Sequence, residues 1–116
     1  MAFYFGNKLK LNIEDKEFVL DISSNKVIKA VQDITNQSIM MTKKKETTED
    51  DINKFIENNK QFITQVLGEE SLNDLFNDKT ITYEDIGELT CYILDEIGKF
   101  KNSRVSKYSK APNALN

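Results

Sequence analysis

The chain of 116 residues contains no histidine, no tryptophan, one cysteine, one proline and four glycines. Without histidine there is no Ser-His-Asp or Cys-His catalytic group and no HExxH zinc site. The single cysteine, Cys91, excludes a disulfide within the chain and a zinc site built from cysteines. The glycines lie too far apart for a P-loop or a GxGxxG turn. We therefore expect a protein that is not an enzyme and has no catalytic, cofactor-binding or metal-binding residues.

Long hydrophobic runs are missing as well. The longest uncharged run, residues 34–42, is too short and too polar to span a bilayer. The first residues lack the basic region and the apolar stretch of a signal peptide. With 39% hydrophobic and 30% charged residues and a formal charge of -3, the composition is typical of one soluble domain. We expect a reduced, cytoplasmic protein with no membrane contact.

Apolar and polar side chains alternate over the first 22 residues. A period of two with one apolar face predicts two half-buried strands, joined by a polar turn at residues 14–16. Residues 3–5 predict a third strand of an antiparallel β-meander that occupies residues 1–22. So small a sheet must pack on helices to be stable. The alternating apolar residues are Leu9, Leu11, Ile13, Phe18, Leu20 and Ile22.

From residue 23 the apolar spacing becomes helical. Residues 23–25 are typical of an N-cap, so a first long helix should begin there and end near Asn36, or as late as Met41. Thr48 and Asp51 resemble a capping box at the start of a second long helix. Gly68 is typical of the residue that terminates such a helix.

Two further helices complete the expected fold. Ser71 should cap a short helix, and Thr82 should cap a third long helix that ends near residue 101. The sequence thus predicts an α+β, mainly helical fold, with an N-terminal antiparallel β-meander packed on a small bundle of three long helices and one short helix. The expected core residues are Phe55, Ile56, Phe62, Ile63, Leu89 and Ile93.

Composition changes near the end of the chain. Residues 1–101 predict a single globular domain, helical from 23 to 101, and residues 102–116 predict a flexible basic tail. The apolar period stops after Phe100, and Pro112 cannot continue a helix. Residues 1–98 hold 11 bases and all 19 acids, a charge of -8, and no acid follows. The bases from residue 99 onward are Lys99, Lys101, Arg104, Lys107 and Lys110.

Two short motifs resemble functional sites only superficially. Residues 74–85 follow part of a calcium-loop pattern, but Phe76 stands at a ligand position and Lys79 stands where glycine is needed. An ordinary loop that joins two helices explains this segment better. Ser71 resembles the phosphopantetheine attachment site of acyl carrier proteins, but the preceding residue is Glu rather than Asp. Helix capping is a sufficient role for this serine.

Small residues share one side of the last predicted helix, at Gly87, Cys91, Leu94 and Gly98. Two glycines on one stripe of a helix interior cost stability, which favours a close approach by another helix. That helix could come from the same chain or from a second chain in a homo-oligomer. Cys91 is then a small packing residue, because no basic residue lies within one turn to activate its thiol.

The order of these elements resembles a known family. The strings that carry the resemblance are residues 29–34, 66–69, 75–76, 94–97 and 107–108, and it covers roughly residues 3–108. The chain resembles the small tail assembly chaperones of long-tailed, siphovirus-type bacteriophages and prophages of Gram-positive bacteria. The family has no catalytic motif against which the sequence can be compared.

The resemblance implies a role and partners. Such chaperones bind the long, helical tape measure protein in the host cytoplasm before the tail tube polymerises, and they are absent from the mature virion. A longer form, made by ribosomal frameshifting, recruits tail tube subunits. The alternative is a small regulatory or nucleic-acid-binding phage protein that uses the basic C-terminal end, although five cations beside one tyrosine are a weak nucleic-acid footprint. A third alternative is an enzyme or carrier domain that uses Ser71 or a pair of carboxylates.

Overall fold

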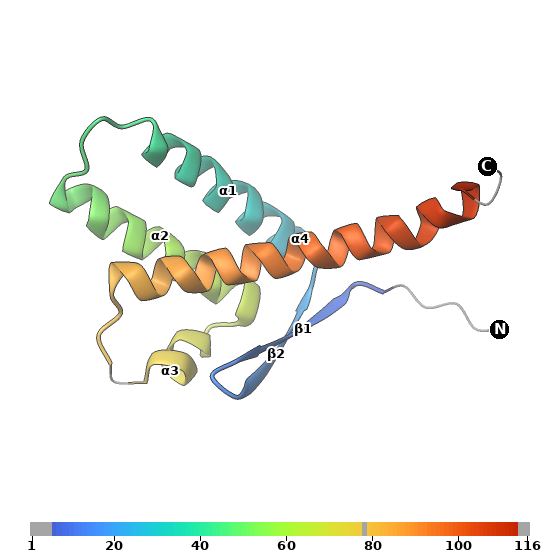
Figure 1. Cartoon of the computed structure of the whole chain (residues 1–116). Helices are drawn as coiled ribbons and strands as arrows, with labels where there is room; N and C mark the ends of the chain where they lie inside the picture. The colour runs from blue at the N-terminus through green and yellow to red at the C-terminus, as the bar shows by residue number, and fades with distance from the viewer. Residues whose placement is uncertain (1–5, 78, 114–116) are drawn as a thin grey trace.

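The computed structural model describes the backbone of residues 6–77 and 79–113 and the side chains as far as residue 103. A β-hairpin is followed by four helices, of which the first two lie side by side in antiparallel directions (Figure 1). The fourth helix crosses this pair and is the longest element. The elements are β1 (Lys8–Ile13), β2 (Lys16–Asp21), α1 (Asn25–Thr42), α2 (Glu49–Leu67), α3 (Ser71–Phe76) and α4 (Tyr83–Asn113).

The hairpin has the alternation that its sequence predicts. Leu9 pairs with Leu20 in antiparallel register, and both side chains are buried. Glu14 and Asp15 form the turn with φ values of 51° and 63°, which match a tight turn that follows the strand twist. Ion pairs link the two strands at Lys8–Asp21 and Lys10–Glu17. The predicted third strand, at residues 3–5, lies outside the described residues.

Local signals start and end the helices. The Thr48 hydroxyl oxygen accepts a hydrogen bond from the backbone N–H of Asp51, and the Asp51 carboxylate accepts one from the N–H of Thr48. This capping box begins α2 as predicted. Gly68 ends α2 with a φ of 110°, a conformation that favours glycine. Thr82 caps α4 by accepting a hydrogen bond from the N–H of Asp85.

Helix α2 lies at the centre of the molecule, because it packs against α1, α3, α4 and β2. Its inward stripe meets the apolar face of the hairpin and the stripes of α1 and α4. Of the six expected core residues, Phe62, Ile63 and Ile93 are buried, and the other three are half-buried against the core. The α+β, mainly helical fold class is therefore confirmed.

One predicted helix cap is wrong. The N-cap of α3 is Glu70, and the side chain of Ser71 lies inside the helix, where it is buried. The Ser71 hydroxyl donates a hydrogen bond of 2.6 Å to the carbonyl oxygen of Gly68. The serine therefore satisfies a carbonyl at the end of α2 instead of the free N–H groups of α3.

The predicted end of the last helix is also wrong. Helix α4 does not stop near residue 101 but continues through Asn113, and its far end extends past the other helices (Figure 1). Lysine and arginine are good helix formers, and cations favour the C-terminal end of a helix, so an apolar period is not required there. Pro112 lies in the final turn, one residue before the helix ends. The flexibility of residues 102–116 stays a prediction.

The central position of α2 predicts a large effect of Phe62→Ala. The Phe62 side chain is 2% exposed, so its removal should lower the free energy of unfolding by about 3–5 kcal/mol. Urea unfolding followed by circular dichroism measures this change. Val19→Ala, at a side chain that is 51% exposed, is the control and should change stability by less than about 0.5 kcal/mol. A Phe62→Ala effect as small as that of the control would contradict the described core.

Candidate binding groove between α1 and α2

The C-terminal half of α1 exposes apolar side chains. Its N-terminal half is anchored in the core by Val27, Ala30 and Ile34. Beyond Ile34 the helix leaves the core, and the side chains of Ile39 and Met40 are 48% and 67% exposed. Two large apolar side chains exposed within one helical turn form a surface that a binding partner can cover.

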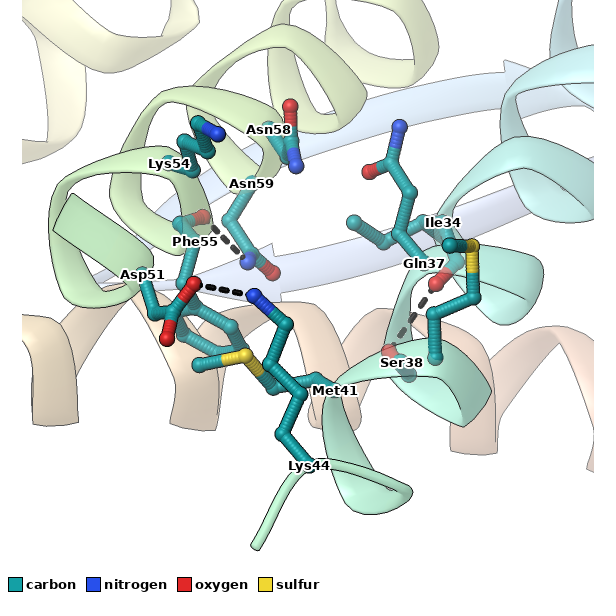
Figure 2. Close-up of a pocket in the computed structure, with 11 residues that line it drawn as sticks. Ile34, Gln37, Ser38, Met41, Lys44, Asp51, Lys54, Phe55, Asn58 and Asn59 are labelled. Atoms are coloured by element: carbon teal, nitrogen blue, oxygen red, sulfur yellow. Dashed lines mark hydrogen bonds and ion pairs between the residues drawn. The ribbon is translucent and has the colours of Figure 1, made fainter. Parts of the chain in front are cut away.

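A groove lies between this end of α1 and the start of α2 (Figure 2). It has a volume of about 230 Å³ and is open to the surrounding solvent. Met41 of α1 and Phe55 of α2 form its apolar wall, and Lys44 reaches across one end toward Asp51. The lining residues are Ile34, Gln37, Ser38, Met40, Met41, Lys44, Asp51, Lys54, Phe55, Asn58 and Asn59.

Several polar groups of the groove already have partners within their own helix. The Ser38 hydroxyl donates a hydrogen bond of 2.9 Å to the carbonyl oxygen of Ile34. The Asn59 side-chain amide, which is buried, donates one of 2.7 Å to the carbonyl oxygen of Phe55. These hydrogen bonds compensate the burial of polar groups. The side chains that remain available to a partner are mainly Met40, Met41 and the ring of Phe55.

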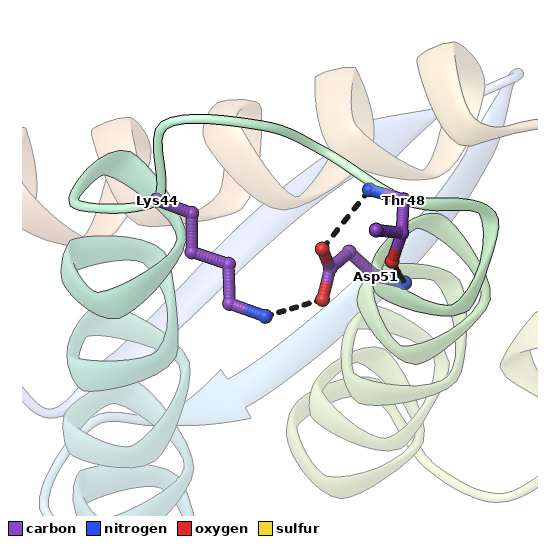
Figure 3. Close-up of polar contacts among 3 residues, drawn as sticks. All are labelled: Lys44, Thr48 and Asp51. Atoms are coloured by element: carbon purple, nitrogen blue, oxygen red, sulfur yellow. Dashed lines mark hydrogen bonds and ion pairs between the residues drawn. The ribbon is translucent and has the colours of Figure 1, made fainter.

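Asp51 lies at one end of the groove (Figure 2), and Figure 3 shows its contacts with Lys44 and Thr48. Its carboxylate forms an ion pair with Lys44 and accepts the hydrogen bond from the Thr48 backbone, and its side chain is 8% exposed. The hydrogen bond from Lys44, followed by those from Thr48, lowers the pKa of Asp51 to about 2. The carboxylate thereby joins the linker after α1 to the first turn of α2 and fixes the spacing of the two helices.

Phe55 connects the groove to α4. Its ring lies 4.6 Å from the ring of Tyr83, measured between centroids. A second, shallower hollow lies on the α4 side of this ring, and Phe55 lines both surfaces. Its lining residues are Phe55, Tyr83, Glu84, Gly87, Glu88 and Cys91. The apolar surface therefore continues from the methionines of α1 through Phe55 to the first turns of α4.

The structure divides the predicted stripe of small residues. A Cβ atom added at Gly87 would lie 3.3 Å from Cζ of Phe55, so the helix that approaches Gly87 belongs to the same chain. Nothing lies within 4 Å of a Cβ atom added at Gly98. Cys91 is exposed, and Leu94 is half-buried against the core. The four residues therefore do not form one contact within the chain.

The predicted basic residues lie along the second half of α4. Lys99 forms ion pairs with Asp95 at 3.0 Å and with Glu96 at 3.8 Å. The hydrogen bond with Asp95 raises the pKa of Lys99. Lys101 is exposed. The side chains of the remaining bases, Arg104, Lys107 and Lys110, lie outside the described part of the structure.

The two superficial motifs differ in what the structure shows. Because the Ser71 hydroxyl is buried and donates to Gly68, it is not presented to a modifying enzyme as a carrier-protein serine must be. In the calcium-like segment, Asp78 lies outside the described residues. Among the residues that the structure does describe, no three His, Cys, Asp or Glu side chains come together as a metal site.

The residue pattern does not predict the groove, although one signal for it is present. Ile39, Met40 and Met41 follow a polar stretch of α1, so their apolar side chains extend the helix past the residues that fill its core stripe. A run of three adjacent apolar residues points in several directions around a helix, and part of it must face outward. The shape of the groove depends on the angle between α1 and α2, which no residue pattern specifies.

The low pKa of Asp51 predicts that the contact between the end of α1 and the start of α2 loses stability in acid. The carboxylate ionises more readily in the folded state than at its usual pKa of 3.8, so its stabilisation is complete above pH of about 4. It is lost as the pH falls toward the folded value of about 2. We expect Asp51→Asn to lower stability at neutral pH and to reduce the loss of stability over this acid range. Urea unfolding at a series of pH values measures both effects.

Asp50→Asn is the matched control, because Asp50 is the preceding residue in the same turn and is exposed. Both variants remove one negative charge from the N-terminal turn of α2. If the two variants give the same stability at every pH, the contact of Asp51 with Lys44 and Thr48 does not fix the linker.

Comparisons with protein-family models, with curated proteins and with solved structures find no match to this chain. Within the described residues, no helix has a stretch that is both long and apolar enough to cross a membrane.

Proposed function

We propose that this chain is a non-catalytic phage tail assembly chaperone that binds an amphipathic helix of the tape measure protein in the α1–α2 groove. The observation that carries the proposal is the open groove lined by Met40, Met41 and Phe55. The sequence resemblance to tail assembly chaperones supplies the identity of the partner. The chaperone acts in the host cytoplasm, and a longer frameshifted form recruits tail tube subunits.

The groove has the chemistry that helix binding requires. An amphipathic helix inserts apolar side chains at positions i, i+3 and i+4 into an apolar groove. Methionine side chains are flexible and polarisable, so they adapt to partner residues of different shapes. This property suits a chaperone whose long partner presents many non-identical helical segments. Lys54 and Asn58 at the edge of the groove supply polar contacts to the solvent-facing side of the bound helix.

Weak binding at each segment is compatible with this function. A long partner that binds several chaperone copies in series is kept soluble by their combined coverage. Each copy must also be released when the tail tube forms around the tape measure protein, which disfavours tight individual contacts. The runner-up function is a small regulatory or nucleic-acid-binding protein. The five bases between Lys99 and Lys110, with no acid among them, favour this function.

The test is co-expression with overlapping fragments of the tape measure protein from the same phage genome. We expect the wild-type chain to bind at least one fragment and to keep it soluble. The double variant Met40→Ser and Met41→Ser should weaken this binding about ten-fold or more, because it removes two apolar side chains that line the groove. Isothermal titration calorimetry with the purified fragment measures the change.

Ile28→Ser is the matched control, because Ile28 is also an exposed apolar residue of α1, at 40% exposure, and does not line the groove. It should leave the affinity unchanged. Equal weakening by the control and the double variant would place the binding surface elsewhere. If the wild-type chain binds no tape measure fragment but binds DNA specifically, the runner-up function replaces the chaperone.

A further inference from the structure

The hollow beside the first turns of α4 combines an apolar floor with an acidic rim. It has a volume of about 470 Å³ and is open to solvent. Glu84 and Glu88 form the rim, and both side chains are exposed. Among the residues that the structure describes, no base lines this hollow. The residues of the floor are Phe55, Tyr83, Gly87 and Cys91.

The apolar and acidic residues form adjacent rows along α4. Because a helix turns by about 100° per residue, Glu84 and Glu88 lie on the side of the axis opposite to the buried Ile86. Gly87 and Cys91 lie about 60° around the axis from these glutamates, on the flank that lines the hollow. A helix that lies in the hollow therefore contacts the apolar row and has the acidic row along one edge.

The charge of Glu88 is not compensated within the chain. The helix dipole favours Glu84 and Asp85 in the first turn of α4, but Glu88 lies beyond that turn. Glu84 and Asp85 precede Glu88 by four and three positions, and like charges at these spacings repel. The residues three and four positions after it are Cys91 and Tyr92, neither of which is a base. Among the described side chains, no ion pair involves Glu84 or Glu88, so both carboxylates are available to cations of a partner.

The ring of Phe55 joins the hollow to the α1–α2 groove. It points from α2 toward α4 (Figure 2), where it lies 4.6 Å from the ring of Tyr83. The same ring lines the groove together with Met41. Apolar surface is therefore continuous from the groove to the acidic rim, and one bound helix can cover both concave surfaces.

We infer that the hollow beside α4 extends the groove and selects partner helices that carry lysine or arginine along one flank of their apolar stripe. The apolar stripe covers the floor of the hollow, and the bases on its flank meet Glu84 and Glu88. For the identity of the partner this inference rests on the proposed function, in which the tape measure protein supplies the helix. The surface itself can be tested with any helix of this charge pattern.

Charge complementarity favours a basic helix over other occupants. The phosphates of a nucleic acid would be repelled by the two glutamates of the rim and by the charge of -8 that residues 1–98 carry. An acidic helix would place like charges beside the rim, which is unfavourable. A helix with bases on one flank is attracted by the rim while its apolar side chains remove the floor from water.

Two synthetic helical peptides test the charge preference. Both have the same leucines at positions i, i+3, i+4 and i+7, and the residues that flank this stripe are lysine in one peptide and glutamate in the other. At low ionic strength we expect the full chain to bind the lysine peptide about ten-fold more tightly or better than the glutamate peptide. The difference should shrink at about 0.5 M salt, because salt screens exposed charges. Fluorescence anisotropy of the labelled peptides measures both affinities.

Removal of the acidic rim should abolish this preference. The double variant Glu84→Gln and Glu88→Gln should weaken binding of the lysine peptide about five-fold, since it removes two exposed ion pairs. The matched control is Glu69→Gln with Glu70→Gln, which removes the same charge from exposed residues that line neither surface. The control should leave the affinity unchanged. Circular dichroism of each variant shows that it is folded.

Alkylation of Cys91 tests whether the bound helix lies in the hollow. Cys91 is the only cysteine of the chain, is exposed and lines the hollow. We expect a saturating amount of the lysine peptide to slow the reaction of this thiol with iodoacetamide about five-fold or more, because the helix covers it. A tape measure fragment that binds the chain should give the same protection. Without a partner, the rate should not depend on the concentration of the chain.

The inference fails if the two peptides bind equally well, or if the bound lysine peptide leaves the alkylation rate unchanged. A tape measure fragment that binds in the groove but does not protect Cys91 would refute the inference and leave the proposed function standing. Protection by the lysine peptide, with no binding of any tape measure fragment, would refute the proposed function and leave the selective hollow standing. Slower alkylation of the chain alone at higher concentration would make a second copy the occupant and overturn the inference.

Discussion

Burial of α2 on several sides is the interaction on which the rest of the structure depends. The two-stranded hairpin has too little apolar surface to be stable alone, and its buried leucines require a helix to cover them. Phe62 and Ile63 supply that cover and also contribute to the core shared with α4. Helix α1 is held through the same helix. Without α2, helices α1 and α3 would lose the element on which they pack, and α4 would keep only its smaller contact with β1.

The same arrangement explains why the candidate groove lies at the end of α1. The core ends at Ile34 on α1 and near Phe100 on α4, but both helices continue. On α1 the continuation carries exposed apolar side chains that flank a groove. On α4 the continuation carries several bases and no acid. The two ends therefore differ in the chemistry of their side chains.

Much of the fold follows from local patterns, and the site does not. Alternation over residues 8–22, the capping box at Thr48 and the glycine at the end of α2 each specify a local conformation, so the elements and the fold class are predictable. The end of α4 is not, because lysine-rich segments form helix without an apolar stripe to mark it. Ser71 shows a related limit, since a serine near a helix start serves the preceding turn as readily as the following one.

Phe55 belongs to the groove and to the hollow beside α4 at the same time, and its ring contacts Tyr83 and the backbone position of Gly87. Any change in the packing of this ring alters the environment of both surfaces. Truncation of Phe55 would therefore measure a sum of two effects. Two double-mutant cycles would separate these effects, one that pairs Phe55 with Met41 and one that pairs Phe55 with Tyr83. The first measures the coupling energy on the side of the groove, and the second measures it on the side of α4.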